Sequence, residues 1–141
     1  MLTFDRETIT GLISQLNSSL HLLAELKSKD IEALTTDPHL LSSAKYNFIV
    51  AIEAVIDICN HLISKNGYRA PDGYGDTFVV LNEQGILSSS LVDDKLIKMA
   101  RFRNRLVHQY WQIDSEYLYG ILQNHLDDFT AFLGELKKSL S

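Results

Sequence analysis

Residues 49–63 read IVAIEAVIDICNHLI, and this stretch decides the fold class. At about 100° per residue, apolar side chains cover almost the whole circumference of a helix here. The exception is a narrow polar stripe formed by Glu53, Asp57, Asn60 and His61. A helix with so much apolar surface belongs at the centre of a bundle. Its polar stripe must then face solvent, a polar interface or a site.

Helical periodicity also dominates the chain on both sides of this stretch. The expected helices begin at residues whose side chains can cap them, namely Asp5, Thr36 or Asp37, Asp76, Ser88 to Ser90, and Asp114 or Ser115, and Asp30 is expected to open a short turn. Where the sequence gives a stop signal, the expected ends lie near Lys27, Lys65, Gly85 and Ser139. The pattern predicts an all-α, up-and-down bundle of four main helices plus a short helix, folded as one domain over residues 1–141.

The composition is that of an ordinary globular domain, with 45% hydrophobic and 22% charged residues. A net charge of −5 disfavours a global grip on nucleic acid, so any RNA contact must be local. The single cysteine, Cys59, has apolar neighbours and fits a buried thiol in a reducing compartment. The N-terminus has no signal-peptide pattern, and no run approaches the ~18 uncharged apolar residues that span a bilayer. We therefore expect a cytoplasmic protein without membrane contact.

The segment RNRLVHQY at residues 103–110 places a charge on an apolar helix face. If the helix starts near Leu91, Arg103 shares its face with apolar side chains, namely Val92, Leu96, Met99, Leu106 and Val107. A guanidinium buried without a partner is strongly destabilising, and it cannot escape by losing its proton. The partner is therefore a carboxylate such as Asp57 or Glu53, a set of carbonyls, or a phosphate that comes and goes.

His108 raises a geometric problem within this segment. On a continuous helix it lies about 140° from Arg103, whereas Tyr110 returns to within about 20° of the arginine. Either the helix ends near Val107, or a second copy across a two-fold axis brings the arginine and the histidine together. A symmetric dimer also explains an apolar stripe that contains a charge.

The spacing Arg103, four residues, His108, one residue, Tyr110 matches the R-x4-H-x-Y motif of the HEPN superfamily. The longer run RNRLVHQYW resembles the HepT branch in particular, and AIEAVIDICNHLI and GYGDTFVVLNEQGIL are similar to its corresponding helix, loop and short helix. The resemblance covers roughly residues 40–140. It implies the toxin half of a HEPN/MNT toxin–antitoxin pair, which is a metal-independent endoribonuclease.

The residue types suit the chemistry that this resemblance implies. RNA brings its own nucleophile, the 2′-hydroxyl, so cleavage needs a group that moves protons and a cation that stabilises the phosphorane. His108 fits the first role, because histidine titrates near neutral pH. Arg103 fits the second, because a guanidinium holds two phosphate oxygens and stays charged. Asn104 would orient the imidazole or a phosphate, and 2′,3′-cyclic phosphate ends are expected without a metal or cofactor.

Tyr110 is the residue at which the resemblance implies regulation. In the HepT branch, the MNT nucleotidyltransferase antitoxin silences the toxin by attaching AMP to the motif tyrosine. Added bulk and negative charge beside Arg103 would block RNA. A tyrosine that simply packs in the fold is the alternative, and both roles can coincide. The expected partners are therefore RNA, the MNT antitoxin, and a second copy of the chain or a higher assembly with the antitoxin.

The remaining polar residues carry weaker expectations. Asp57 and Asn60 would support the site from the polar stripe, or belong to a purely structural network. Four basic residues would guide RNA or are simply solvated, namely Lys95, Lys98, Arg101 and Arg105. No histidine pair has a convincing metal-ligand spacing, and no glycine loop is followed by a phosphate-binding lysine.

Two other functions compete with the nuclease. Related helical domains serve as non-catalytic accessory subunits that help an MNT-type nucleotidyltransferase hold its substrate, and the chain would otherwise be the antitoxin of the pair. The sequence contains no nucleotidyltransferase signature, so the nucleotide chemistry belongs to a partner. The intact Arg103, His108 and Tyr110 favour the nuclease.

Overall fold

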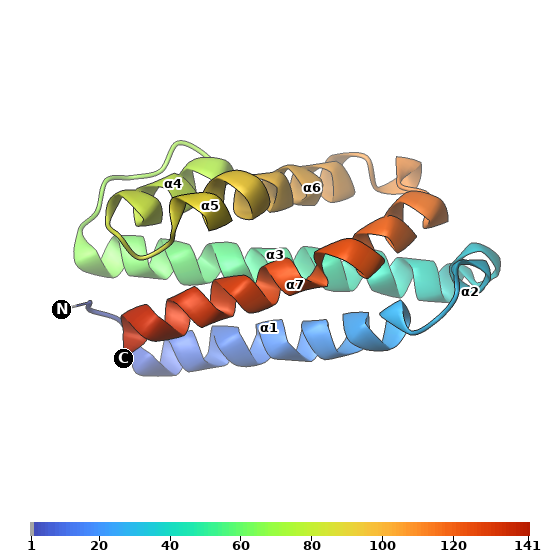
Figure 1. Cartoon of the computed structure of the whole chain (residues 1–141), viewed down its shortest axis with the longest axis horizontal. Helices are drawn as coiled ribbons and strands as arrows, with labels where there is room; N and C mark the ends of the chain where they lie inside the picture. The colour runs from blue at the N-terminus through green and yellow to red at the C-terminus, as the bar shows by residue number, and fades with distance from the viewer. Residues whose placement is uncertain (1) are drawn as a thin grey trace.

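The computed structural model describes residues 2–141, which form helices and connecting loops without a strand among them. The long helices are α1 (Arg6–Lys27), α3 (Pro38–Asn66), α6 (Ile97–His108) and α7 (Ser115–Leu140). The short elements are α2 (Ile31–Thr36), α4 (Tyr74–Glu83), α5 (Ser89–Leu91), the π-helical turn η1 (Val92–Leu96) and the 3₁₀ turn η2 (Tyr110–Gln112). Successive long helices run in alternating directions (Figure 1), which confirms the predicted all-α, up-and-down bundle.

The central helix of the bundle is α3, which packs against α1, α2, α4, α6 and α7. Its core side chains include Phe48, Ile52, Val55, Ile58 and Leu62. By length and composition alone α3 is apolar enough to cross a membrane, but 61% of its most apolar window is buried inside the bundle. Other helices pack against α3 on several sides, which explains why apolar residues cover almost the whole circumference of this helix.

Aspartate side chains begin most of these helices, as expected except at Asp30, where the sequence predicted a short turn and the structure has helix α2. Asp5, Asp30, Asp37 and Asp114 each accept a hydrogen bond from a backbone N–H in the first turn of the following helix. Helix α3 ends at Gly67, whose φ of 65° lies in the left-handed region that glycine adopts without strain. Capping chemistry thus sets both ends of the central helix.

One expected helix start is wrong. Helix α4 begins at Tyr74 after Gly73, whereas the sequence placed its cap at Asp76. Asp76 instead lies in the first turn and accepts hydrogen bonds from the guanidinium of Arg69. Two N–H groups of Arg69 donate to the carboxylate of Asp76. They take the place of the backbone N–H groups that would donate to Asp76 if it capped the helix.

Candidate functional site

Helix α6 carries Arg103, Asn104 and His108 of the candidate site. It is fixed to the bundle by buried side chains that include Met99, Phe102 and Leu106. Phe102 meets Phe48 of α3 edge to face, with 5.4 Å between the ring centroids. Val107 was expected on the same apolar stripe but is 41% exposed, because it lies at the edge of that stripe.

Arg103 is partly buried, with 15% of its side chain exposed. Its Nη2 donates a 2.9 Å hydrogen bond to Oε1 of Glu53, and its Nη1 donates one of 3.2 Å to Oδ1 of Asn104. The ring of Tyr74 lies 4.7 Å from the guanidinium carbon. The Nε of Arg103 is buried and has no hydrogen-bond partner among residues 2–141. Within one chain the counter-ion of Arg103 is therefore Glu53 and not Asp57.

The carboxylate of Glu53 lies at the rim of the site, with 44% of its side chain exposed. Asp57 follows one turn later on α3, where partial burial and the nearby charge of Glu53 raise its pKa. An ion pair that is open to solvent contributes little to stability. The pair between Arg103 and Glu53 is therefore not required to hold α6 on α3.

His108 is the last residue of α6, and its side chain is exposed. Four residues lie between it and Arg103 on the helix, so the two side chains leave α6 about 140° apart. Asn104 is exposed and its Oδ1 accepts a hydrogen bond from Arg103, while no hydrogen bond joins Asn104 to the imidazole among residues 2–141. The structure thus brings Arg103 and Asn104 together in one chain, but not Arg103 and His108.

Tyr110 lies outside α6, in the 3₁₀ turn η2, because Gln109 leaves the helical conformation at φ −130° and ψ 35°. The alternative that the helix ends near Val107 is thereby confirmed, because α6 ends at His108 and Tyr110 does not return to the side of Arg103 as it would on a continuous helix. Lys45 of α3 is only 4% exposed, and its Nζ donates a 2.7 Å hydrogen bond to the carbonyl of Tyr110. The same Nζ lies 4.6 Å from the centre of the Tyr110 ring, while the ring of Trp111 meets Tyr110 edge to face at 5.3 Å.

The contact between Lys45 and Tyr110 was not predicted from the sequence. Burial lowers its pKa, and the negative charge of Asp114 opposes that shift. A buried amine with two contacts to one residue is an anchor for η2. It has no signal in the sequence beyond its position on the otherwise apolar α3.

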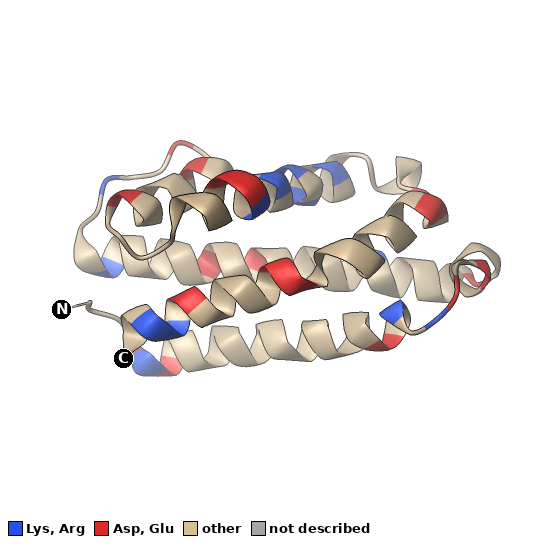
Figure 2. Ribbon diagram, viewed as in Figure 1, with Lys and Arg blue, Asp and Glu red and all other residues tan. Residues whose placement is uncertain are grey.

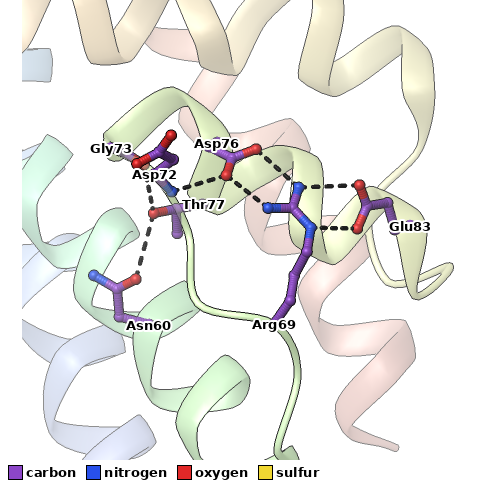
Figure 3. A network of polar contacts seen from close by, with 7 residues as sticks. All are labelled: Asn60, Arg69, Asp72, Gly73, Asp76, Thr77 and Glu83. Atoms are coloured by element: carbon purple, nitrogen blue, oxygen red, sulfur yellow. Dashed lines mark hydrogen bonds and ion pairs between the residues drawn. The ribbon is translucent and has the colours of Figure 1, made fainter.

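The rest of the polar stripe on α3 serves the fold. The Oδ1 of Asn60 accepts a 3.4 Å hydrogen bond from Thr77 of α4 (Figure 3). The Nε2 of His61 accepts one of 2.9 Å from the backbone N–H of Asp5. Asn60 therefore does not touch Arg103. Its connection to the candidate site runs through α4, which also carries Tyr74.

A three-residue ion-pair network holds the loop before α4 (Figure 3). Arg69 contacts Asp76 at 2.8 Å and Glu83 at 2.8 Å, and the backbone N–H of Asp72 also donates to Asp76. The Arg69 guanidinium and this N–H lower the pKa of Asp76 to about 2. The network ties both ends of α4 to one arginine, and it thereby fixes the helix from which Tyr74 reaches Arg103.

Basic side chains gather on α6 and the turn before it (Figure 2). Lys95 pairs with Asp128 at 3.5 Å, and the guanidinium of Arg105 lies 4.7 Å from the centre of the Tyr117 ring. Lys98 and Arg101 are exposed. Among residues 2–141, no three His, Cys, Asp or Glu side chains converge as metal ligands would. The candidate site therefore presents cations and a histidine to solvent.

Comparisons with known proteins identify the family of the chain. A family model described as Ribonuclease HepT-like matches residues 16–136 of the chain. The chain belongs to the HepT-like family. The sequence resemblance to that branch is thereby confirmed over most of the chain, including the second half of α1, to which the motifs added little.

Relatives of this HepT-like protein are similar in sequence and in fold. The mRNA nuclease HepT of Shewanella oneidensis is 32% identical over 98 residues, which are 70% of this chain and 73% of that protein. A crystallised toxin–antitoxin with AMP-PNP contains a chain with a TM-score of 0.85 and 26% identity, covering 94% of this chain and 99% of that one. A tri-AMPylated HEPN toxin of Shewanella oneidensis in complex with MNT antitoxin gives a TM-score of 0.84 at 26% identity, covering 95% and 99%.

Proposed function

We propose that this HepT-like protein is the toxin of a HEPN/MNT toxin–antitoxin pair, and that it cleaves RNA with Arg103 and His108. The observation that carries the proposal is the partly buried guanidinium of Arg103, whose Nε has no partner and whose only counter-ion among the described residues is half-exposed. The relatives called mRNA nuclease and HEPN toxin support the same assignment.

The proposed active site combines two copies of the chain. Because Arg103 and His108 leave α6 about 140° apart, one helix cannot direct both at the same phosphate. A two-fold axis that pairs the α6 helices would let each arginine meet the histidine of the other copy. The site then holds two guanidinium groups and two imidazoles around one phosphodiester.

This arrangement supports cleavage through a cyclic phosphate. One neutral imidazole takes the proton of the 2′-hydroxyl as that oxygen attacks phosphorus. The bond from phosphorus to the 5′ oxygen breaks, and a protonated imidazole gives its proton to the departing oxygen. The products are a 2′,3′-cyclic phosphate and a 5′-hydroxyl. Arg103 stabilises the phosphorane charge while Asn104 holds the guanidinium, and no step needs a metal.

The other candidate residues take supporting roles in this proposal. Asp57 would add negative charge behind Glu53, and Asn60 would act only by fastening α4. The basic residues Lys95, Lys98, Arg101 and Arg105 would guide the RNA strand along α6. We further propose that the MNT partner attaches AMP to Tyr110, where the added phosphate would repel the RNA backbone.

A non-catalytic accessory subunit of an MNT-type nucleotidyltransferase is the second candidate. The ion pair between Arg103 and Glu53 favours it, because the cation is already neutralised within one chain. A protein that only holds its partner's substrate would keep this pair permanently.

Expression of the chain with and without its neighbouring gene separates these functions. The chain alone is expected to arrest growth, His108→Ala to relieve the arrest, and His21→Ala, a change of another exposed histidine, to leave it intact. Purified protein should cut RNA in the presence of a chelator and leave cyclic phosphate ends. If the wild type is harmless and leaves RNA whole, the accessory role replaces the nuclease. Mass spectrometry after co-expression tests Tyr110 through an AMP-sized increase on its peptide.

A further inference from the structure

Trp111 has an unusual position for its residue type. It is 91% exposed, more than any other large hydrophobic side chain among residues 2–141. It is also the single tryptophan of the chain. An indole in water forgoes the burial that normally stabilises it, so an exposed tryptophan beside a candidate site indicates a surface that is covered when the protein works.

The turn that presents Trp111 is anchored to the core. The buried Nζ of Lys45 holds the carbonyl of Tyr110 at 2.7 Å and lies against the ring of Tyr110. The rings of Tyr110 and Trp111 meet at an interplanar angle of 82°. The indole is thus supported by Tyr110 on one side and open elsewhere, which is the geometry of a preorganised stacking platform.

The basic residues that precede Trp111 in the sequence, in a segment that lies between Asp94 and Asp114, select the kind of ligand. Residues 95–112 contain five of the thirteen Lys and Arg residues of the chain and none of its eighteen Asp and Glu residues. This segment is the basic part of a protein whose net charge is −5. An aromatic side chain at the end of such a segment fits a ligand that is anionic along its backbone and flat in its side groups.

We propose that Trp111 stacks on an unpaired base of the RNA, in a nucleotide close to the cleaved bond. The inference rests on the proposed ribonuclease function and adds that the substrate is single-stranded at this point. Bases in a duplex are covered on both faces by their neighbours, whereas an unpaired base offers a face to an aromatic side chain. Trp111 follows His108 by three residues, so the stacked base and the reacting phosphate belong to the same stretch of strand.

The fluorescence of the single tryptophan reports on this contact without any cleavage. The test uses the full-length His108→Ala protein, which leaves RNA intact, and a short single-stranded oligoribonucleotide. Stacking is expected to quench the indole emission as the RNA binds. Inorganic polyphosphate, which has the charge but no bases, and a blunt RNA duplex are expected to leave the emission nearly unchanged.

Variants of Trp111 give a second readout. By anisotropy of labelled RNA, Trp111→Ala in the same background is expected to weaken binding by about fivefold or more, as loss of one stacked base does. Trp111→Phe is expected to retain most of the affinity, and Gln112→Ala, an exposed neighbour in the same turn, to bind normally. Since Trp111 is exposed, the melting temperature should not change.

The outcomes distinguish this inference from the nuclease itself. RNA that binds without quenching, or a Trp111→Ala protein that binds and cleaves RNA as the wild type does, overturns the stacking role and leaves the nuclease standing. A Trp111→Ala protein that cleaves normally but no longer associates with the antitoxin shows a protein contact, and this also overturns it. If the wild type neither binds nor cleaves RNA, both proposals fail together.

Discussion

Glu53 and Arg103 join α3 to α6 through a 2.9 Å ion pair, and the ring of Tyr74 lies against the same guanidinium. The cation proposed to bind phosphate is therefore in contact with a carboxylate of its own chain. In the proposed function, a phosphodiester that binds the Nη2 of Arg103 would displace Glu53, which is open to solvent on one side. Glu53 would then both align the guanidinium and compete with the substrate for it.

Glu53→Gln is expected to tighten RNA binding. The amide keeps the length of the side chain and one hydrogen-bond acceptor, but it removes the competing charge. A solvent-open pair is worth up to about 1 kcal/mol, so the dissociation constant should fall by up to about fivefold. Anisotropy of labelled RNA in the His108→Ala background measures this change. Glu7→Gln on α1 changes the net charge by the same amount and should have little effect on RNA binding. If Glu53→Gln binds RNA more weakly than the wild type, the role of Glu53 in aligning Arg103 outweighs its competition with the phosphate.

Tyr74→Leu is expected to lower the rate of RNA cleavage. The ring of Tyr74 contributes about 0.5–1 kcal/mol to holding the guanidinium, so its loss should reduce kcat/KM by about two- to fivefold. Tyr74→Phe retains the aromatic face and should behave as the wild type does. Steady-state cleavage of a short RNA gives kcat/KM for the wild type and for both variants. A rate for Tyr74→Leu equal to that of the wild type would show that Glu53 alone positions Arg103.

The network of Arg69 should make stability depend on pH in the acid range. Arg69 and the N–H of Asp72 hold the pKa of Asp76 at about 2 in the folded protein, below the value of about 4 in an unfolded chain. A pKa that is lowered by folding stabilises the protein above the unfolded value, and this stabilisation is lost as the pH falls through the folded value. The melting temperature of the wild type should therefore approach that of Asp76→Asn between about pH 5 and about pH 2.

The control for this experiment is Asp127→Asn, which removes an exposed carboxylate on α7. Its melting temperature should stay at a constant distance from that of the wild type over the same range. If the difference in melting temperature between the wild type and Asp76→Asn does not narrow as the pH falls, the ion pair does not stabilise the folded state.

Cys59 should react only when the protein unfolds. Its side chain is fully buried on α3, and burial raises the pKa of the thiol, so the reactive thiolate is scarce. A colorimetric thiol reagent should label the native protein negligibly and the urea-unfolded protein completely. Rapid labelling without denaturant would show that the bundle opens locally around α3.

The boundaries of the long helices could be predicted because local chemistry sets them. Asp5, Asp37 and Asp114 each bind a backbone N–H within their own segment, and Gly67 supplies a local backbone conformation. The motif also predicted that Arg103 lies partly buried, since the period of a helix alone places it among apolar residues. Such features depend on neighbours within a few positions along the chain.

The contacts of the site could not be predicted from the same pattern. Lys45 and Tyr110 are 65 positions apart, and Arg103 and Glu53 are 50 apart. A helical wheel cannot show which of two carboxylates on α3 will meet a cation on α6. It also left open whether the helix ends near Val107 or continues to Tyr110, and the backbone turn at Gln109 decides this. Contacts between distant segments decided each of these points.

The apolar surface of α3 has a consequence during synthesis. The ribosome completes α3 while α6 and α7 are still untranslated, and adding the remaining 74 or so residues takes several seconds at about 5–20 residues per second. At the start of that interval only α1 and α2 have been made to cover a helix that is hydrophobic on nearly every side. Nascent chains that stall before α6 should therefore require chaperones, and a premature stop in that region should yield aggregates in place of an inactive soluble fragment.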